Sequence, residues 1–236
     1  MMKYIVTKTK NMRIVKGGLL MTRKDKAVKI CDILDTIYPA AVCSLEYEKP
    51  YEQMIATRLS AQCTDARVNI VTQTLFRDFP TLDSFADADI AALEEAVKPC
   101  GFYRAKAKSI KEMCIRVREV YGGEVPDNMD DLLTLPGIGR KTANLLLGDV
   151  YGKAAVVTDT HCIRISGRLG LTKRHAPEHV EEDLRKVLPP ERSNRYCHQM
   201  VLFGRDTCTS RNPKCAECPL KNFCVDPAFS KIAKKK

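Results

Sequence analysis

The feature that most constrains the fold of this 236-residue chain is a helical spacing of apolar side chains along nearly its whole length. Between residues 104 and 121, apolar residues recur at steps of three and four, which is the period of one helix face. The same spacing predicts helices over eight further segments: 25–38, 51–62, 65–78, 87–97, 140–150, 159–170, 178–188 and 193–206. Only residues 154–157 have an extended character, which is too short for a sheet. The sequence therefore predicts an all-α fold of many short helices.

Composition places the chain among globular proteins with a basic surface. Its 44% hydrophobic and 29% charged residues are an ordinary balance for one large or two small domains. No apolar run approaches the length of about 20 residues that crosses a membrane, so no membrane partner is predicted. The excess of 39 Lys and Arg over 29 Asp and Glu gives a net charge of +10. This charge predicts attraction to polyanions, with solubility alone as the alternative explanation.

The two ends of the chain and its scattered cysteines bear on its location. Residues 1–21 hold several lysines and no acidic residue, lack the apolar core of a secretory signal, and are predicted to form a flexible basic extension. Residues 230–236 are predicted to form a basic tail. Seven of the eleven cysteines stand singly in helical patterns, which is typical of a reducing compartment and indicates a cytoplasmic protein.

Residues 135–143, Leu-Pro-Gly-Ile-Gly-Arg-Lys-Thr-Ala, predict a tight hairpin that leads directly into a helix. Gly137 and Gly139 are expected to adopt backbone angles that other residues avoid, and to let an outside group approach the main chain. The first amides of a helix have no intrahelical partner, so this turn suits an anion such as a DNA phosphate. Lys141 would hold an amine beside that phosphate, which suits chemistry on a nucleic-acid sugar. The alternative is an ordinary turn followed by a solvated lysine.

Four cysteines near the C-terminus have the spacing of a metal centre. Cys208, Cys215, Cys218 and Cys224 lie close enough in the chain to converge at a small loop-closure cost. A structural zinc site commonly uses two C-x2-C pairs, whereas this quartet has one such pair with longer arms, which favours an iron–sulfur cubane. Zinc and free thiols stay open as alternatives. His198, nearby in the sequence, is interpreted as a helix-face residue.

Asp159 begins a second helical segment, 18 residues after Lys141. Because the helix between them is followed by a short connection, the two helix N-termini can lie together and Asp159 can face Lys141. A carboxylate there would accept a proton or stabilise a developing sugar cation. The alternative is that Asp159 is simply an N-cap, and Asp127 is likewise expected to cap a short helix before Leu135.

Together these motifs resemble endonuclease III, a family of iron–sulfur DNA glycosylases and abasic-site lyases in the helix-hairpin-helix superfamily. The matching stretches run in family order and span about residues 22–226. They are 59–65, 101–107, 123–126, 135–144, 159–161 and the cysteine quartet. The hairpin alone would mark only the superfamily, whereas Lys141, Asp159 and the cysteine spacing together are specific to this family.

The resemblance implies two domains with DNA in the cleft between them. Residues 43–153 would form a six-helix barrel that contains the helix-hairpin-helix. Residues 22–42 and 154–229 would form a discontinuous domain that holds a [4Fe-4S] cluster on the four cysteines. The resemblance also implies a monomeric, bacterial-type enzyme of base excision repair, whose substrate is duplex DNA with oxidised pyrimidines or abasic sites.

The resemblance assigns chemistry to two residues. Lys141 matches the family nucleophile, which attacks the sugar C1′, expels the damaged base and forms a Schiff base. β-Elimination then cleaves the strand on the 3′ side of the lesion. Asp159 matches the carboxylate that assists this chemistry.

A second set of residues is implied in DNA binding. An enzyme that acts on a base takes it out of the stack, and Gln62 matches the side chain that fills the resulting hole. Phe102 occupies the wedge position, where a leucine is the common residue, and an aromatic ring can also enter between bases. Without the resemblance, Gln62 would be read as a polar helix residue and Phe102 as a core aromatic. Further DNA contacts are expected from Gly137, Gly139, Arg140, Arg211 and Lys214. Glu48 and Glu52 are interpreted as a solvated face.

Three alternatives to this function stay open. A related glycosylase could excise oxidised guanine or act on mismatches, because base preference is set by pocket residues that no motif reveals. Adenine glycosylases of the superfamily generally lack the hairpin lysine and carry an additional C-terminal domain, so Lys141 and the short chain disfavour them. A non-catalytic DNA-binding module would use the hairpin and the cluster for phosphate contacts alone.

Overall fold

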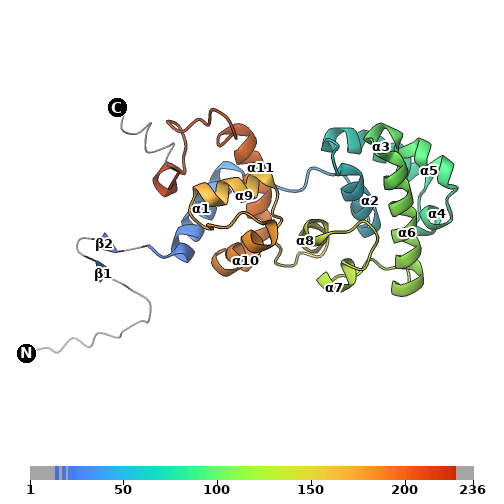
Figure 1. Ribbon diagram of the computed structural model, residues 1–236, viewed down its shortest axis with the longest axis horizontal. Helices are drawn as coiled ribbons and strands as arrows, with labels where there is room; N and C mark the ends of the chain where they lie inside the picture. The colour runs from blue at the N-terminus through green and yellow to red at the C-terminus, as the bar shows by residue number, and fades with distance from the viewer. Residues whose placement is uncertain (1–13, 16–17, 20, 227–236) are drawn as a thin grey trace, which may run out of the picture.

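The computed structural model describes residues 14–15, 18–19 and 21–226. Most of the predicted basic extension 1–21, and all of the predicted basic tail 230–236, lie outside the described residues. In the described part of the extension, β1 (Ile14–Val15) pairs with β2 (Gly18–Leu19) as a short antiparallel ladder. From residue 21 to residue 226 the regular structure is helical, which confirms the predicted all-α fold (Figure 1).

Each of the nine predicted segments agrees with a helix to within three residues at either end, whereas the sequence predicts no segment for α4 (Leu82–Asp87). The α-helices of the described chain are α1 (Arg23–Ile37), α2 (Pro50–Ser60), α3 (Asp65–Asp78), α4 (Leu82–Asp87), α5 (Ile90–Val97), α6 (Tyr103–Tyr121), α7 (Met129–Leu132), α8 (Arg140–Asp149), α9 (Thr160–Arg168), α10 (Pro177–Val187) and α11 (Ser193–Asp206). Short 3-10 turns are η1 (Lys98–Cys100), η2 (Pro190–Arg192) and η3 (Lys221–Phe223). None of the helices in this part of the chain is long and apolar enough to cross a membrane.

Side-chain caps explain where several of these helices begin. Asp89 Oδ1 accepts a hydrogen bond from Ala92 N at 2.9 Å, so α5 starts after Asp89 and the segment predicted from residue 87 begins too early. The predicted cap of α7 is wrong by one residue. Asn128 Oδ1 accepts from the Asp131 amide, while Asp127 forms an ion pair with Lys153. Such caps each stabilise a helix by about 1 kcal/mol.

The buried apolar residues form two separate cores, which appear as two lobes in Figure 1. The first core runs from Leu45 to Ala155 and is built from α2 to α8, with Phe85 buried against the rings of neighbouring aromatic residues. The second core combines α1 with α9, α10 and α11, so the two ends of the described chain meet in one lobe. Each Leu or Phe side chain that is fully buried in these cores contributes about 1.5–3 kcal/mol to folding.

Helix α8 lies where the two lobes meet (Figure 1). Ala143, Leu146 and Leu147 on this helix belong to the first core. At its C-terminus, Asp149 Oδ1 accepts hydrogen bonds from Asn194 Nδ2 and pairs with His198 Nε2 of α11, both at 2.7 Å. Helix α8, which follows the glycine hairpin, is therefore held in place by both lobes.

Candidate active site and nucleic-acid interface

The glycine hairpin joins α7 to α8 and rests on the first core. Leu135 and Ile138 are buried beneath it, and Ile138 N donates to Leu135 O at 3.1 Å. Gly137 has φ +81°, in the left-handed region that favours glycine. A Cβ at this position would lie 2.9 Å from Arg58 Nε, and the same Nε donates to Ser109 Oγ at 2.7 Å. The turn is therefore pinned directly onto side chains of α2 and α6.

The expected special backbone angle of Gly139 is wrong. Its φ of −99° and ψ of 174° are extended values that any residue adopts. The position is instead distinguished by open space, because a Cβ built there would meet no atom within 4 Å apart from the adjoining chain of the described structure. Gly139 is the N-cap of α8 and has no side chain to bond the first helical amides. An external anion can therefore approach those amides closely.

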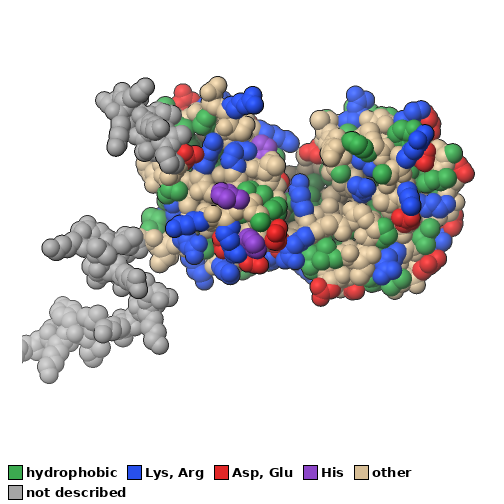
Figure 2. All heavy atoms as spheres, in the orientation of Figure 1, with side chains coloured by type: hydrophobic (Ala, Val, Ile, Leu, Met, Phe, Trp, Pro, Cys, Tyr) green, Lys and Arg blue, Asp and Glu red, His purple; other side chains and the backbone are tan. Residues whose placement is uncertain are grey.

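Lys141 and Asp159 line the same pocket at the junction of the two lobes. The pocket has a volume of about 250 Å³. Lys141 projects from the first turn of α8 and is exposed, whereas Asp159 is the N-cap of α9 and is half-buried. Further polar side chains on the wall of this pocket are Ser44, Ser60, Asp65, His198 and Arg205. Figure 2 shows Lys and Arg side chains on both lobes, with the surface narrowed between them.

Asp159 caps its helix as well as lining the pocket. Asp159 Oδ1 accepts a hydrogen bond from Cys162 N at 2.7 Å. This bond uses one carboxylate oxygen, and the positive end of the α9 dipole stabilises the anion. Two residues further on, burial lowers the pKa of His161, and the charge of Asp159 acts in the opposite direction. Capping and a chemical role in the pocket are thus compatible at Asp159.

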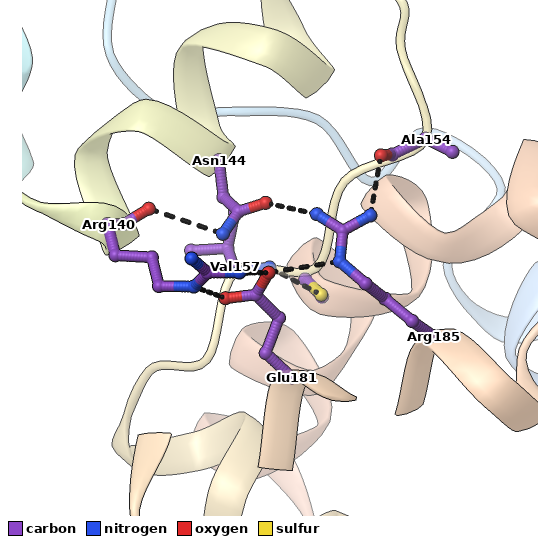
Figure 3. A network of polar contacts seen from close by, with 7 residues as sticks. Arg140, Asn144, Ala154, Val157, Glu181 and Arg185 are labelled. Carbon is purple, nitrogen blue, oxygen red and sulfur yellow. Dashed lines mark hydrogen bonds and ion pairs between the residues drawn. The ribbon is translucent and has the colours of Figure 1, made fainter. Parts of the chain in front are cut away.

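Arg140, a predicted DNA contact, makes a bidentate ion pair across the two lobes (Figure 3). Its Nε and one terminal nitrogen lie 2.7 and 3.0 Å from the carboxylate oxygens of Glu181 on α10. Arg185 donates to the same carboxylate at 2.9 Å and to Asn144 Oδ1 at 2.7 Å. The Glu181 side chain is only 2% exposed. The guanidinium of Arg140 therefore fixes α8 to α10, a role that sequence reasoning missed.

Gln62 and Phe102 are exposed residues in strained backbone conformations. Their φ angles are +56° and +48°, which are rare for residues other than glycine. Phe102 is 69% exposed, so the interpretation as a core aromatic is wrong, and Gln62 lies beyond the end of α2 rather than within it. Strain of this kind costs about 1–3 kcal/mol and clusters at functional sites.

The four predicted metal-ligating cysteines line one pocket at the C-terminal end of the described chain. This pocket brings the four thiols together, and a cubane takes one cysteine ligand at each of its four irons. Arg168 donates to Cys208 Sγ at 3.3 Å, and a neighbouring cation suits a thiolate ligand. The residues present therefore fit an iron–sulfur cluster.

The surroundings of this pocket agree with a basic loop. Arg211 and Lys214, both predicted DNA contacts, are exposed, and Lys214 lines the cysteine pocket. His198 does not line it and pairs with Asp149 instead, as a helix-face residue of α11. The interpretation of Glu52 as solvated is wrong: it is buried, and its Oε2 accepts from the amides of residues 48 and 49 at the start of α2.

The sequence predicts no role for three residues of the pocket wall. Ser44 Oγ donates to Asp65 Oδ2 at 2.6 Å, and an Arg205 terminal nitrogen lies 3.8 Å from the same oxygen. They come from the connection before α2, the start of α3 and the end of α11. No local spacing relates three such distant segments, so only the fold brings them together.

Comparison with known families defines the class of protein. The family model described as "HhH-GPD superfamily base excision DNA repair protein" matches residues 55–190, which include the hairpin and Asp159. The iron–sulfur binding domain of endonuclease III matches residues 208–224, from the first to the last cysteine of the quartet. The fold and the site thus define a helix-hairpin-helix protein of base excision repair with an iron–sulfur centre.

Individual relatives narrow this class. Endonuclease III of Synechocystis sp. is 44% identical over 206 residues, covering 87% of this chain and 94% of the relative. Endonuclease III of Bacillus subtilis is 40% identical over 201 residues, covering 84% of this chain and 92% of the relative. A solved non-covalent endonuclease III–DNA complex has a TM-score of 0.81 at 37% identity, covering 90% of this chain and 99% of the other. The solved structure of a thermostable thymine-DNA glycosylase shares the fold. It has a TM-score of 0.79 at 21% identity, covering 87% of this chain and 97% of the other.

The chain belongs to the endonuclease III family. It is a bifunctional DNA glycosylase and abasic-site lyase of base excision repair that excises oxidised pyrimidines from duplex DNA, and it carries a [4Fe-4S] cluster. These findings confirm the family, fold class, activity and cofactor that the motifs predicted.

Proposed function

We propose that Lys141 is the nucleophile of this glycosylase and that Asp159 is the carboxylate that assists it. The observation that supports the proposal is their common pocket, on which α8 presents an amine and α9 a carboxylate. The hairpin amides beside Lys141 suit a backbone phosphate, which would hold the sugar within reach of the amine.

Each step of the reaction then has a group in the pocket. Lys141 Nζ attacks C1′, the bond from C1′ to the base breaks, and the electron pair leaves with the base. Asp159 stabilises the positive charge that develops on the sugar and accepts a proton from the attacking amine. Opening of the sugar ring gives the Schiff base. Loss of a C2′ proton then expels the 3′ phosphate by β-elimination, which cuts the strand.

The remaining interface residues act on the DNA around the extruded nucleotide. Gln62 fills the hole in the stack and Phe102 wedges between bases, as their exposure and strained backbone support. Gly137 and Gly139 admit a phosphate to the hairpin. Arg140 contributes its backbone amide at the start of α8, because its guanidinium is held by Glu181. Arg211 and Lys214 add phosphate contacts beside the cluster.

Cys208, Cys215, Cys218 and Cys224 are the proposed ligands of the cluster. These four thiolates would hold the cluster, and their attachment to it would fix the conformation of the basic loop. The two cores support a division into a barrel domain at 43–153 and a cluster domain at 22–42 and 154–229. The enzyme would act as a monomer on chromosomal DNA in the cytoplasm of a bacterial cell.

Borohydride trapping on DNA with an abasic site tests the nucleophile. The wild-type enzyme should give a covalent protein–DNA adduct, and Lys141→Ala should abolish it because no other amine is placed at the start of α8. Lys108→Ala is the matched control, since Lys108 is an exposed lysine of α6 whose side chain is 73% accessible. An undiminished adduct with Lys141→Ala would overturn the assignment. Binding without any adduct in the wild type would support a non-catalytic module.

A further inference from the structure

Lys106 is a buried lysine that the chemistry described above does not use. It lies in the first turns of α6, is only 1% exposed, and ranks among the largest fully buried side chains of the described chain. Its Nζ donates to Leu59 O at 2.9 Å and to Cys100 O at 2.8 Å. Burial lowers the pKa of Lys106, and the neighbouring thiols of Cys100 and Cys63 act in the opposite direction. An ammonium in this position is costly unless its hydrogen bonds are made.

The two carbonyl groups that accept from Lys106 lie at the ends of helical segments. Each segment ends shortly before a residue that is proposed to enter the DNA, either Gln62 or Phe102. Leu59 lies in the last turn of α2, three residues before Gln62. Cys100 ends η1, two residues before Phe102. Carbonyl groups at helix ends lack intrahelical partners and carry partial negative charge, so a single cation is attracted to both.

The conformations that follow these carbonyls need support from their surroundings. Gly101 at φ +70° and Phe102 at φ +48° form one left-handed pair, and Gln62 at φ +56° forms the other strained point. Left-handed conformations of residues other than glycine persist only when neighbouring contacts determine them. The Lys106 side chain contacts the backbone of both segments at once.

We propose that Lys106 is a positioning residue for base extrusion, whose ammonium fixes the Gln62 segment and the Phe102 segment relative to each other so that both enter the duplex together. This inference rests on the roles proposed for Gln62 and Phe102. It concerns extrusion only, because Lys106 does not line the pocket that holds Lys141 and Asp159. Lys106 therefore matters for a paired, stacked lesion and is dispensable for an abasic site in single-stranded DNA.

The test compares Lys106→Met with Lys108→Met, which removes an exposed lysine from the same helix. Three quantities are measured: single-turnover excision of an oxidised pyrimidine from duplex DNA, strand cleavage of single-stranded abasic DNA, and the fluorescence of 2-aminopurine beside the lesion as a signal of unstacking. We expect Lys106→Met to slow excision and the fluorescence change by roughly tenfold to a hundredfold, as the loss of charged hydrogen bonds implies. Cleavage of single-stranded abasic DNA should change less than about twofold, and Lys108→Met should match the wild type throughout.

Equal losses in all three quantities would reduce Lys106 to a general structural role and overturn the proposal, as would unchanged excision. Gln62→Ala and Phe102→Ala are measured alongside. If they excise normally, the roles proposed for those residues fail; if they are slow while Lys106→Met is not, the Lys106 inference alone fails. Hydrogen exchange of the wild-type enzyme provides a second measurement that does not depend on a variant. The amides of Cys63 and Gly101, which donate to Ser60 O and Lys98 O, should open at one common rate, and independent rates would refute the coupling.

Discussion

Glu181→Gln is the substitution that most directly tests how the lobes are joined at the start of α8. The Glu181 carboxylate is 2% exposed and accepts three hydrogen bonds from guanidinium groups, two from Arg140 and one from Arg185. Glutamine has nearly the same shape but replaces one oxygen with an amide NH2. The NH2 group can only donate, so it cannot accept a hydrogen bond from the guanidinium groups of the arginines.

The expected magnitude follows from these contacts. A hydrogen bond between charged groups contributes about 1.5–3 kcal/mol, and removal of one partner of a buried ion pair costs about 3–5 kcal/mol. The Arg140 and Arg185 side chains are 49% and 37% exposed, so water recovers part of this loss. We therefore expect Glu181→Gln to lower the free energy of unfolding by about 2–4 kcal/mol, which corresponds to roughly 5–12 °C in Tm for a chain of this length.

Thermal and denaturant unfolding of the holoenzyme measure this difference. Glu182→Gln is the matched control, because Glu182 is the next residue of α10, is 53% exposed, and pairs with Arg174 at 3.1 Å. An exposed pair of this kind contributes about 0–1 kcal/mol, so the control should stay close to the wild type. Equal effects of the two substitutions would refute the assignment of a buried clamp at Glu181.

The difference between wild type and Glu181→Gln should also depend on pH. Burial alone would raise the pKa of Glu181, but the hydrogen bonds from Arg140, Arg185 and Asn144 outweigh it and hold the pKa below its ordinary value of 4.5. A carboxyl whose folded-state pKa is lowered stabilises the fold above its unfolded-state pKa, and this stabilisation disappears as the pH falls through the folded-state value. The difference in stability between the two proteins should therefore shrink as the pH falls below about 4.5, and a constant difference down to pH 3 would contradict the ion pair.

Two further substitution pairs test the hairpin and the α9 cap. Gly137→Ala should destabilise the protein by about 1–3 kcal/mol, because the new Cβ would meet Arg58 at φ +81°, whereas Gly139→Ala should fold normally and weaken DNA binding only; equal loss of stability in both, measured by unfolding, would refute the distinction. Asp159→Asn should keep the cap and lose excision activity, while Asp159→Ala should lose activity and about 1 kcal/mol of stability. Normal excision by Asp159→Asn would show that the carboxylate is only a cap.

The sequence predicts the long helices well because the apolar residues of the buried face repeat at helical spacing within each segment. The segments 65–78 and 193–206 agree with α3 and α11 at both ends. Helix α4 has six residues, fewer than two turns, so no repeated apolar spacing can build up in it. At α7, Asp127 and Asn128 are adjacent residues of equally good capping chemistry, and only the backbone conformation decides between them.

The residues of the candidate site likewise fall into two groups, those that the sequence predicts and those that only the fold reveals. Lys141 and the cysteine quartet stand in local motifs, and the short connection after α8 predicts that Asp159 comes near Lys141. The partners that hold these residues are distant in the sequence: Glu181 lies 41 residues from Arg140, and Lys106 bonds a carbonyl 47 residues away. A buried Lys or Glu in an amphipathic helix looks like any other charged residue until its partners are known.

The position of α8 links these observations to catalysis. Apolar packing holds α8 in the first core, but such contacts are not directional and tolerate small rotations about the helix axis. The hydrogen bonds to the second lobe are directional, and they act at both ends of the helix, through Arg140 to Glu181 and through Asp149 to His198 and Asn194. Rotation of α8 would move Lys141 relative to Asp159, which belongs to the second lobe. The placement of the amine relative to the carboxylate therefore depends on polar contacts at both ends of α8 that involve neither Lys141 nor Asp159. Substitutions at these contacts should lower the rate of Schiff-base formation without removing any reacting group.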